Sequence, residues 1–218
     1  MLAPEPALDV LVLNGSLKHQ DKESSNTEEL AQLVLAYMKE HSPDTRIRSE
    51  IVRLADVTID VGLKFRESAS DEWPRVAEKI GNADIVIFAT PIWWGGRSSL
   101  MQRVIERLDA FDEEAATSGR SALLNKVAGV VITGSEDGAQ ATLAGIMEVL
   151  TFLNFTLPPE CCAYWVGEVG MPPSEDRARR LVNHSAKHMA KNMARNLLFY
   201  AQLLKRHPLV LEGPPEEA

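Results

Sequence analysis

The chain has 218 residues, of which 45% are hydrophobic and 25% are charged, proportions that are ordinary for a globular protein. Its 31 acidic residues outnumber 23 basic residues and give a net charge of −8, which argues against nucleic acid and anionic membrane surfaces as partners. No segment has the roughly 18 to 20 apolar residues of a membrane span, and the N-terminus lacks a signal-peptide pattern. We expect a cytoplasmic protein with a single domain over residues 1–218, with loose termini at about 1–7 and 208–218.

The first element is a continuous apolar strand, Leu8 to Leu13, as expected when helices cover both faces of a parallel sheet. A polar loop and a helix over Thr27 to Glu40 follow it. Unpaired N–H groups at the start of a helix attract anions. Hydroxyl and amide donors gather there, namely Ser16, Ser24, Ser25, Asn26 and Thr27. The loop therefore predicts a phosphate site, but Ser25 and Glu28 also have the spacing of a capping box, which would satisfy the same N–H groups without a ligand.

Further strands and helices alternate along the chain. The strands are expected over Arg46 to Leu54 at a sheet edge, Ile85 to Ala89, Val127 to Thr133 and, irregularly, Phe155 to Val166. The helices are expected over Asp71 to Asn82, from Ser98 or Ser99 through Phe111, over Ala139 to Asn154 and over about Ser174 to Arg206, with connections over Asp56 to Ser70 and Asp112 to Asn125. This alternation predicts an α/β fold, a doubly wound sheet of five parallel strands with helices on both faces.

Glycine and serine follow the first, third and fourth strands, at the edge of the sheet where such folds bind ligands. A dinucleotide site would need G-x-G-x-x-G, but only Gly15 follows the first strand, and no esterase-type G-x-S-x-G occurs. A mononucleotide fits better, with its phosphate at the first helix and a flat ring bordered by Trp93 and Trp94. FMN has one phosphate, a ribityl chain and a planar ring, and it meets these requirements.

Three motifs carry a resemblance to a known family: Gly15-Ser16 with Ser25-Asn26-Thr27, then Thr90 to Gly96, then Thr133 to Gly138. Taken in this order, they resemble the flavodoxin-like NAD(P)H-dependent FMN reductase superfamily, from Leu8 to about Tyr200. The resemblance implies a flavodoxin-like strand order of 2-1-3-4-5, a non-covalently bound FMN and NADPH or NADH as hydride donor. It also implies a homodimer or homotetramer.

The resemblance further implies roles for individual residues. Around the phosphate it places Ser16, Lys18, Ser25, Asn26 and Thr27. Along the ribityl chain and ring it places Pro91, Ile92, Trp93, Trp94, Gly95 and Gly96, and on the far side of the ring Thr133, Gly134, Ser135, Glu136, Asp137 and Gly138. No catalytic residue is assigned, because the flavin carries the chemistry. The loop from Leu17 to Glu23 is longer than the compact family form, and its Asp21 and Glu23 would oppose a phosphate unless they point to water.

The expected function is that of an oxidoreductase that takes hydride from NAD(P)H and passes electrons to a quinone or another small acceptor. The alternative is an electron carrier or flavin-binding regulatory protein without its own nicotinamide activity, and a third possibility is a degenerate fold used only for assembly. No metal site is expected, because His184 and His188 lack a third ligand. The basic residues of the last helix are expected on a solvated face, with pairing to an acidic partner surface as the alternative; they are Arg177, Arg179, Arg180, Lys187, Lys191 and Arg195.

Overall fold

The computed structural model describes residues 7–210; residues 1–6 and 211–218, which hold most of the two expected loose termini, lie outside the described part. Its sheet has parallel strands β1 (Leu8–Asn14), β2 (Ile47–Arg53), β3 (Ile85–Trp93), β5 (Val127–Gly134) and β6 (Cys162–Val166). They lie in the order β2-β1-β3-β5-β6, with β2 at an edge as predicted. Since β4 (Gly96–Arg97) only forms a short antiparallel hairpin with β3, the predicted order of the five main strands is confirmed.

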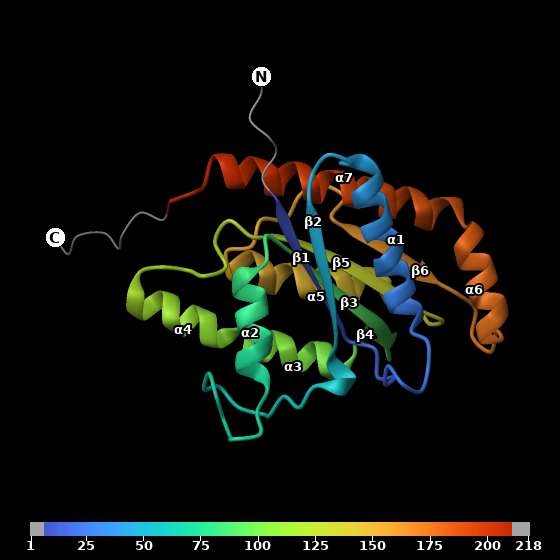
Figure 1. Cartoon of the computed structure of the whole chain (residues 1–218). Coiled ribbons are helices and arrows are strands. Elements are labelled where there is room, and N and C mark those ends of the chain that lie inside the picture. The colour runs from blue at the N-terminus through green and yellow to red at the C-terminus, as the bar shows by residue number, and fades with distance from the viewer. Residues whose placement is uncertain (1–6, 211–218) are drawn as a thin grey trace.

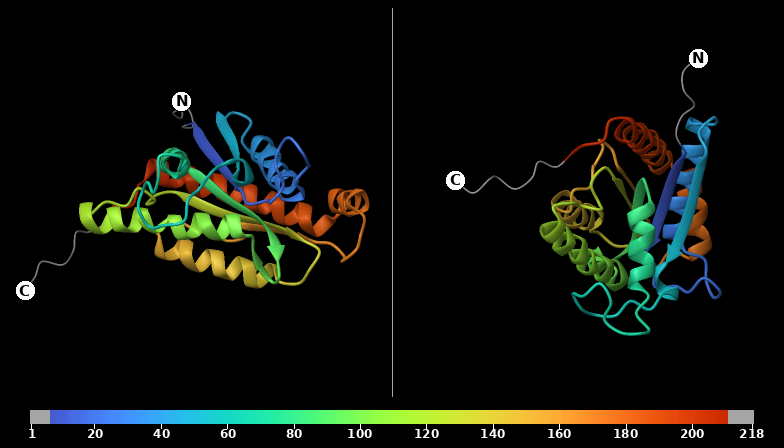
Figure 2. Two further views of the ribbon diagram at one scale, coloured as in Figure 1. Left: turned by 90° about the horizontal axis from the view of Figure 1, so that it is seen from below. Right: turned by 60° about the vertical axis from the view of Figure 1, so that its left-hand side comes forward.

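Helices cover both faces of the sheet (Figures 1 and 2). One face is covered by α1 (Asn26–His41) and α7 (His184–Arg206), and α6 (Pro173–Val182) precedes α7. The other face is covered by α2 (Trp73–Asn82), α3 (Ser99–Arg107), α4 (Asp109–Ser118) and α5 (Ala139–Phe152). Within residues 7–210, no helix combines the length and apolarity that crossing a bilayer requires.

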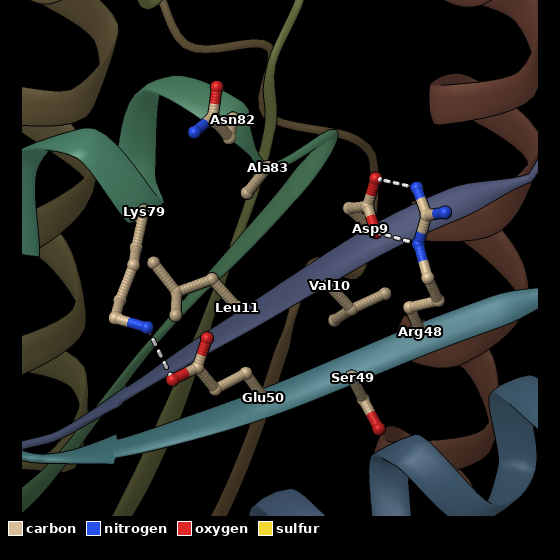
Figure 3. Close-up of a pocket in the computed structure, with 9 residues that line it drawn as sticks. All are labelled: Asp9, Val10, Leu11, Arg48, Ser49, Glu50, Lys79, Asn82 and Ala83. Atoms are coloured by element: carbon tan, nitrogen blue, oxygen red, sulfur yellow. Dashed lines mark hydrogen bonds and ion pairs between the residues drawn. The ribbon is translucent and has the colours of Figure 1, made fainter.

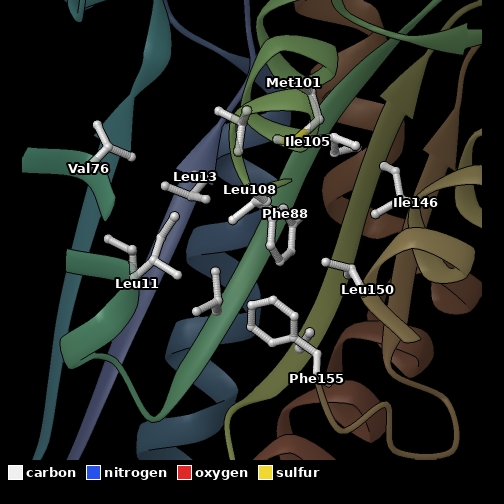
Figure 4. Close-up of a cluster of buried hydrophobic side chains, with 14 of the residues drawn as sticks. Leu11, Leu13, Val76, Phe88, Met101, Ile105, Leu108, Ile146, Leu150 and Phe155 are labelled. Atoms are coloured by element: carbon white, nitrogen blue, oxygen red, sulfur yellow. The ribbon is translucent and has the colours of Figure 1, made fainter. Parts of the chain in front are cut away.

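The two faces bury alternate residues of each central strand, because successive side chains of a strand point to opposite sides. Leu11, Leu13 and Phe88 pack against α2 to α5 (Figure 4), whereas Val10 and Val12 pack against α1 and α7. Full burial of one such side chain stabilises the fold by about 1.5 to 3 kcal/mol. The continuous apolar strands therefore hold both helical layers against the sheet.

Buried Arg107 holds the long connection between β2 and α2. Its guanidinium donates to the carbonyl oxygens of Asp60 at 2.8 Å and Lys64 at 2.7 Å, and to Asp71 Oδ2 at 3.0 Å. It also lies 5.6 Å from the ring centre of Trp73. These contacts from one side chain of α3 fix residues 57–72, which form no helix or strand.

Several predicted boundaries are wrong, and the expected irregular strand over Phe155 to Val166 forms only as β6, Cys162–Val166. The segment after Ala89 remains a strand through Trp93, because Thr90 and Pro91 pair with β5, and Ile92 and Trp93 pair with β4. The expected connection over Asp112 to Asn125 contains most of α4, which ends at Ser118 and is capped by Gly119 in a left-handed conformation. The expected last helix is two helices, because Asn183 is extended and caps α7 by accepting a hydrogen bond from Ala186 N.

Candidate functional site

A cavity of about 330 Å³ lies at the carboxyl ends of β1, β3, β5 and β6. Its lining comes from five segments of the chain: Ser16, Lys18, Asn26, Thr27, Pro91, Ile92, Trp93, Thr133, Gly134, Ser135, Glu136, Trp165, Glu168, Met171, Pro173 and Asp176. This edge of a doubly wound sheet is where ligands bind, and the volume is that of a small-ligand site. The three predicted loops therefore meet around one space.

The loop after β1 is packed tightly against the end of β3. Gly15 N donates to Ala89 O at 2.7 Å, and Ser98 Oγ donates to Gly15 O at 2.6 Å. A Cβ on Gly15 would lie 2.9 Å from Ser98 Oγ and 3.1 Å from Met101 Cβ, so the position requires glycine. Buried Asn14 accepts from Ser16 N at 3.1 Å, and these contacts fix Ser16 at the cavity wall.

The first turn of α1 is capped by Ser25, and its first two residues line the cavity. Ser25 Oγ accepts from Glu28 N at 3.1 Å, which confirms the predicted cap on that side. The Glu28 carboxylate pairs with buried Arg53 rather than completing the capping box. The first intrahelical hydrogen bond runs from Glu29 N to Ser25 O, so the N–H groups of the preceding helical residues have no intrahelical partner. An anion is a suitable partner for them.

Thr27 links α1 to β5 at the floor of the cavity. Its Oγ1 lies 2.6 Å from Thr133 Oγ1, and both side chains are buried. A hydroxyl has one proton and two lone pairs, so one of the two hydroxyls retains a free donor after this contact. The pair therefore supplies a preformed polar group that faces the cavity.

The long loop after Ser16 carries one cation into the site. Lys18 lines the cavity, donates to Ser24 O at 3.4 Å and lies 3.3 Å from Glu23 Oε2. Asp21 and Glu23 are both exposed to solvent. Their charges are therefore screened by water. This exposure is what the sequence analysis requires of Asp21 and Glu23 if an anion is to bind at this loop.

The β3–β4 hairpin places its two tryptophans differently. Trp93 lines the cavity and is 47% exposed, whereas Trp94 is 90% exposed at the turn. Trp94 and Gly95 both have positive φ values, of 49° and 77°, as in the type I′ turn that favours hairpins. Of the two predicted ring neighbours, only Trp93 therefore lies at the cavity.

Gly138 brings the β5–α5 loop against this hairpin. Its φ is +123°, and a Cβ there would lie 2.6 Å from Gly95 Cα. Gly134, at the end of β5, is also closely packed, since its Cβ would lie 2.9 Å from Ile92 Cβ. Glycine at these two positions is therefore what allows the second and third loops to meet.

Eleven of the predicted residues line the cavity and six do not. Those in the lining are Ser16, Lys18, Asn26, Thr27, Pro91, Ile92, Trp93, Thr133, Gly134, Ser135 and Glu136. Those outside it are Ser25, Trp94, Gly95, Gly96, Asp137 and Gly138. The six outside act as the helix cap or belong to the two loop turns that support the wall.

Sequence reasoning missed the wall made by β6, α6 and the loop between them. Trp165, Glu168, Met171, Pro173 and Asp176 form it. The carboxyl end of β6 lies at the same sheet edge as the predicted loops. The rule that ligands bind at the carboxyl ends of parallel strands would therefore also have found Trp165.

Asp176 accepts from Trp165 Nε1 at 2.8 Å and from Asn26 Nδ2 at 3.1 Å. The expectation of a solvated basic face is wrong for Arg180, which is 3% exposed and donates to Asn26 Oδ1 at 3.1 Å. These contacts place the start of α6 directly against the start of α1. No local pattern in the sequence indicates them, because the partners are about 150 residues apart.

The residues present suit an anion that carries a planar ring, as FMN does. Hydroxyl donors, the Lys18 ammonium and the start of α1 lie at one end, and they suit a phosphate. Trp93 and the glycine-rich loops lie at the wall formed by β3 and β5, and they suit a flat ring. The described residues hold no group of three or more metal-binding side chains.

A second cavity of about 340 Å³ lies away from this edge (Figure 3). It adjoins the amino-terminal half of β1, and its charged side chains are paired with one another, Asp9 with Arg48 and Lys79 with Glu50. Parallel α/β sheets bind ligands at the carboxyl ends of their strands. The cavity beside Thr27 and Thr133 is therefore the stronger candidate, although the two have similar volumes.

The chain is similar to two curated proteins, each at 34% identity. One is the 8-demethyl-8-aminoriboflavin-5'-phosphate synthase of Streptomyces davaonensis, matched over 178 residues that cover 77% of this chain and 66% of that protein. The other is the divalent metal cation transporter MntH of Mycobacterium bovis, matched over 171 residues that cover 77% of this chain and 24% of the transporter. The chain thus spans just under two thirds of one relative and about a quarter of the other.

One solved structure and one family profile agree with the fold. The crystal structure of RosB with the bound intermediate 8-demethyl-8-formylriboflavin-5'-phosphate has a TM-score of 0.79 and 30% identity, over 93% of this chain and 82% of that one. The sequence profile of NADPH-dependent FMN reductase matches residues 8–168, a family whose cofactors are FMN and NAD(P)H. Because that match covers most of the chain and includes all five main strands, the chain belongs to the NADPH-dependent FMN reductase family.

Proposed function

We propose that the chain binds FMN in the cavity at the carboxyl edge of the sheet and acts as an NAD(P)H-dependent oxidoreductase. The observation that carries the proposal is the meeting of three loops around one cavity, with the start of α1 at its polar end. When bound, FMN supplies the chemistry, accepting hydride from the nicotinamide and passing electrons on. The protein supplies orientation, hydrogen bonds and exclusion of water.

Each part of the lining has a role in this proposal. Ser16, Thr27 and Lys18 hold the phosphate through hydroxyl and ammonium donors, and the first N–H groups of α1 add to them. Trp93 borders the ring, and Thr133 on β5 fixes Thr27 on α1 through the contact between their hydroxyls. No side chain is assigned a proton-transfer step.

The Thr27→Val variant tests the FMN site. Valine keeps the shape but removes the hydroxyl, so the FMN dissociation constant should rise by about tenfold to a hundredfold, the loss of one hydrogen bond to a charged group. Thr151→Val is the matched control, since Thr151 lies on the exposed side of α5 and its hydroxyl only donates to Met147 O. Equal FMN affinity of both variants and the unaltered protein would refute the assignment.

We propose a quinone or another small electrophile as the electron acceptor. The cavity wall of Trp93, Ile92, Met171 and Pro173 is apolar, and a planar apolar acceptor suits it. In the presence of FMN, NADPH or NADH oxidation should accelerate when a soluble benzoquinone is added. Nicotinamide oxidation that is independent of added quinone would overturn this choice of acceptor.

A second candidate function is chemistry on a flavin phosphate held as substrate. It is favoured by the 34% identity to the 8-demethyl-8-aminoriboflavin-5'-phosphate synthase and by the TM-score of 0.79 with RosB. Mass spectrometry of the flavin recovered after incubation with protein distinguishes the two functions. An unchanged FMN mass after many nicotinamide turnovers supports the reductase, and a changed mass supports the second function.

We further propose that the protein is cytoplasmic and forms a homodimer or homotetramer. The exposed Trp94 at the hairpin turn supports an assembly that covers it, since large exposed aromatic side chains are typical of interfaces. Light scattering coupled to size-exclusion chromatography should give a mass of two or four chains. A mass of one 24.1 kDa chain would contradict the proposed assembly.

A further inference from the structure

Two charged side chains of α6 hold the first residue of α1 at the edge of the cavity. Asp176 Oδ2 accepts from Asn26 Nδ2 at 3.1 Å. Arg180 donates to Asn26 Oδ1 at 3.1 Å and to Asn26 O at 3.2 Å. The Asn26 side chain thus has its oxygen and one of its N–H groups engaged by α6, which fixes the first turn of α1 relative to the cavity.

Arg180 is a buried cation with unused hydrogen-bonding capacity. Its side chain is 3% exposed, and within the described residues its Nε has no hydrogen-bond partner. Its Nη2 lies 2.9 Å from Glu29 Oε2, and its Nε lies 4.0 Å from Asp176 Oδ2. Because a buried charge is costly unless it is paired, this guanidinium depends on the two carboxylates and they depend on it.

Asp176 brings a negative charge to the wall where the phosphate is proposed. It lines the cavity, and Trp165 Nε1 donates to its Oδ1 at 2.8 Å. The close approach depends on Gly167, since a Cβ there would lie 2.1 Å from Asp176 Oδ1. An uncompensated carboxylate at this place would repel a phosphate. Arg180 is the buried cation that offsets it.

We propose that Arg180 and Asp176 are positioning residues that set how strongly the cavity prefers a phosphate-bearing flavin over the same flavin without phosphate. Asp176 fixes Asn26 and Trp165 in place, and Arg180 fixes Asn26 and cancels the charge of Asp176. Both lie beyond the segment 8–168 that matches the family profile. The inference rests on the proposed FMN site, and it assigns the phosphate selectivity to α6 as well as to the loop after β1.

The test compares dissociation constants of FMN and riboflavin for the full chain and three variants. Arg180→Met removes the buried cation and should lower the preference for FMN by at least about tenfold, because at an effective dielectric constant of about 20 a unit charge has this effect or a larger one out to about 12 Å. Asp176→Asn removes the carboxylate and should raise the preference. Arg177→Met is the matched control, because Arg177 also pairs with Glu29 at 3.0 Å, but from the exposed side of α6, and it should leave the preference within about twofold.

The outcomes separate a selective role from a merely structural one. A loss of affinity that is equal for FMN and riboflavin in Arg180→Met would show that Arg180 only supports the fold, and would overturn the inference. If Arg180→Met does not fold, Asp176→Asn decides, since an unchanged or lowered FMN preference in that variant also overturns it. A wild-type protein that binds neither flavin overturns the proposed function itself. A wild-type protein that binds FMN and riboflavin equally overturns only the inference about Arg180 and Asp176.

Discussion

Replacement of Gly138 by alanine tests whether the contact between two loops builds the site. Gly138 has φ of +123°, and an added Cβ would lie 2.6 Å from Gly95 Cα and 2.9 Å from Gly95 O. The strained backbone costs about 1 to 3 kcal/mol, and the overpacking costs about 1 to 3 kcal/mol more. We expect Gly138→Ala to lower the free energy of unfolding by about 2 to 6 kcal/mol.

The same substitution should weaken FMN binding at least tenfold, because it moves the hairpin that carries Trp93 away from the β5–α5 loop. Denaturant unfolding and FMN titration measure the two effects. Gly119→Ala is the control: Gly119 also has positive φ, of +67°, but its added Cβ meets no atom within 4 Å. That variant should lose only about 1 to 2 kcal/mol and should keep its FMN affinity. If Gly138→Ala matches Gly119→Ala in both measurements, the reasoning about this contact is wrong.

Three further predictions concern stability and pH. Arg107→Met leaves Asp71 as an unpaired buried charge, so denaturant unfolding should show a loss of about 3 to 5 kcal/mol; a loss below about 1 kcal/mol would contradict the role of this pair. The hydrogen bond from Arg48 holds the pKa of Asp9 below its usual 3.8, so the unfolded state binds the proton more readily. The stability advantage over Asp9→Asn should therefore be complete at pH values above 3.8 and should be lost as the pH falls through the folded pKa of Asp9. An advantage that stays constant from pH 7 down to the acid limit of the native state would refute this. Ser25→Ala removes the α1 cap and should lower the free energy of unfolding by about 0.5 to 2 kcal/mol, while FMN affinity stays within about threefold. A tenfold loss of FMN affinity would instead indicate that Ser25 is a direct ligand.

The sheet and the loops at its edge could be predicted because their signals are local. The continuous apolar run at Val10 to Leu13 indicates a strand that is buried on both faces, and these four residues are buried. Ser25, three residues before Glu28, marks the start of α1. The hairpin was missed, although Gly95 after Trp94 is a readable signal for a tight turn with positive φ.

The α6 wall could not be predicted, because its contacts are not local. Asp176 and Arg180 resemble ordinary charged residues of an exposed helix, and only the folded chain places them beside Asn26. The break at Asn183 is similar, since asparagine is tolerated within helices but also caps them well. Tertiary packing decides between the two conformations in such cases.

The most direct test of the account is a rapid-mixing measurement on the FMN-loaded full chain under anaerobic conditions, with NADPH and then NADH. We predict that the visible flavin absorption bleaches within seconds with at least one of the two nicotinamides, and that it returns when a quinone is added. A flavin band that persists with both nicotinamides would contradict the account and indicate an electron carrier that needs a separate reductase.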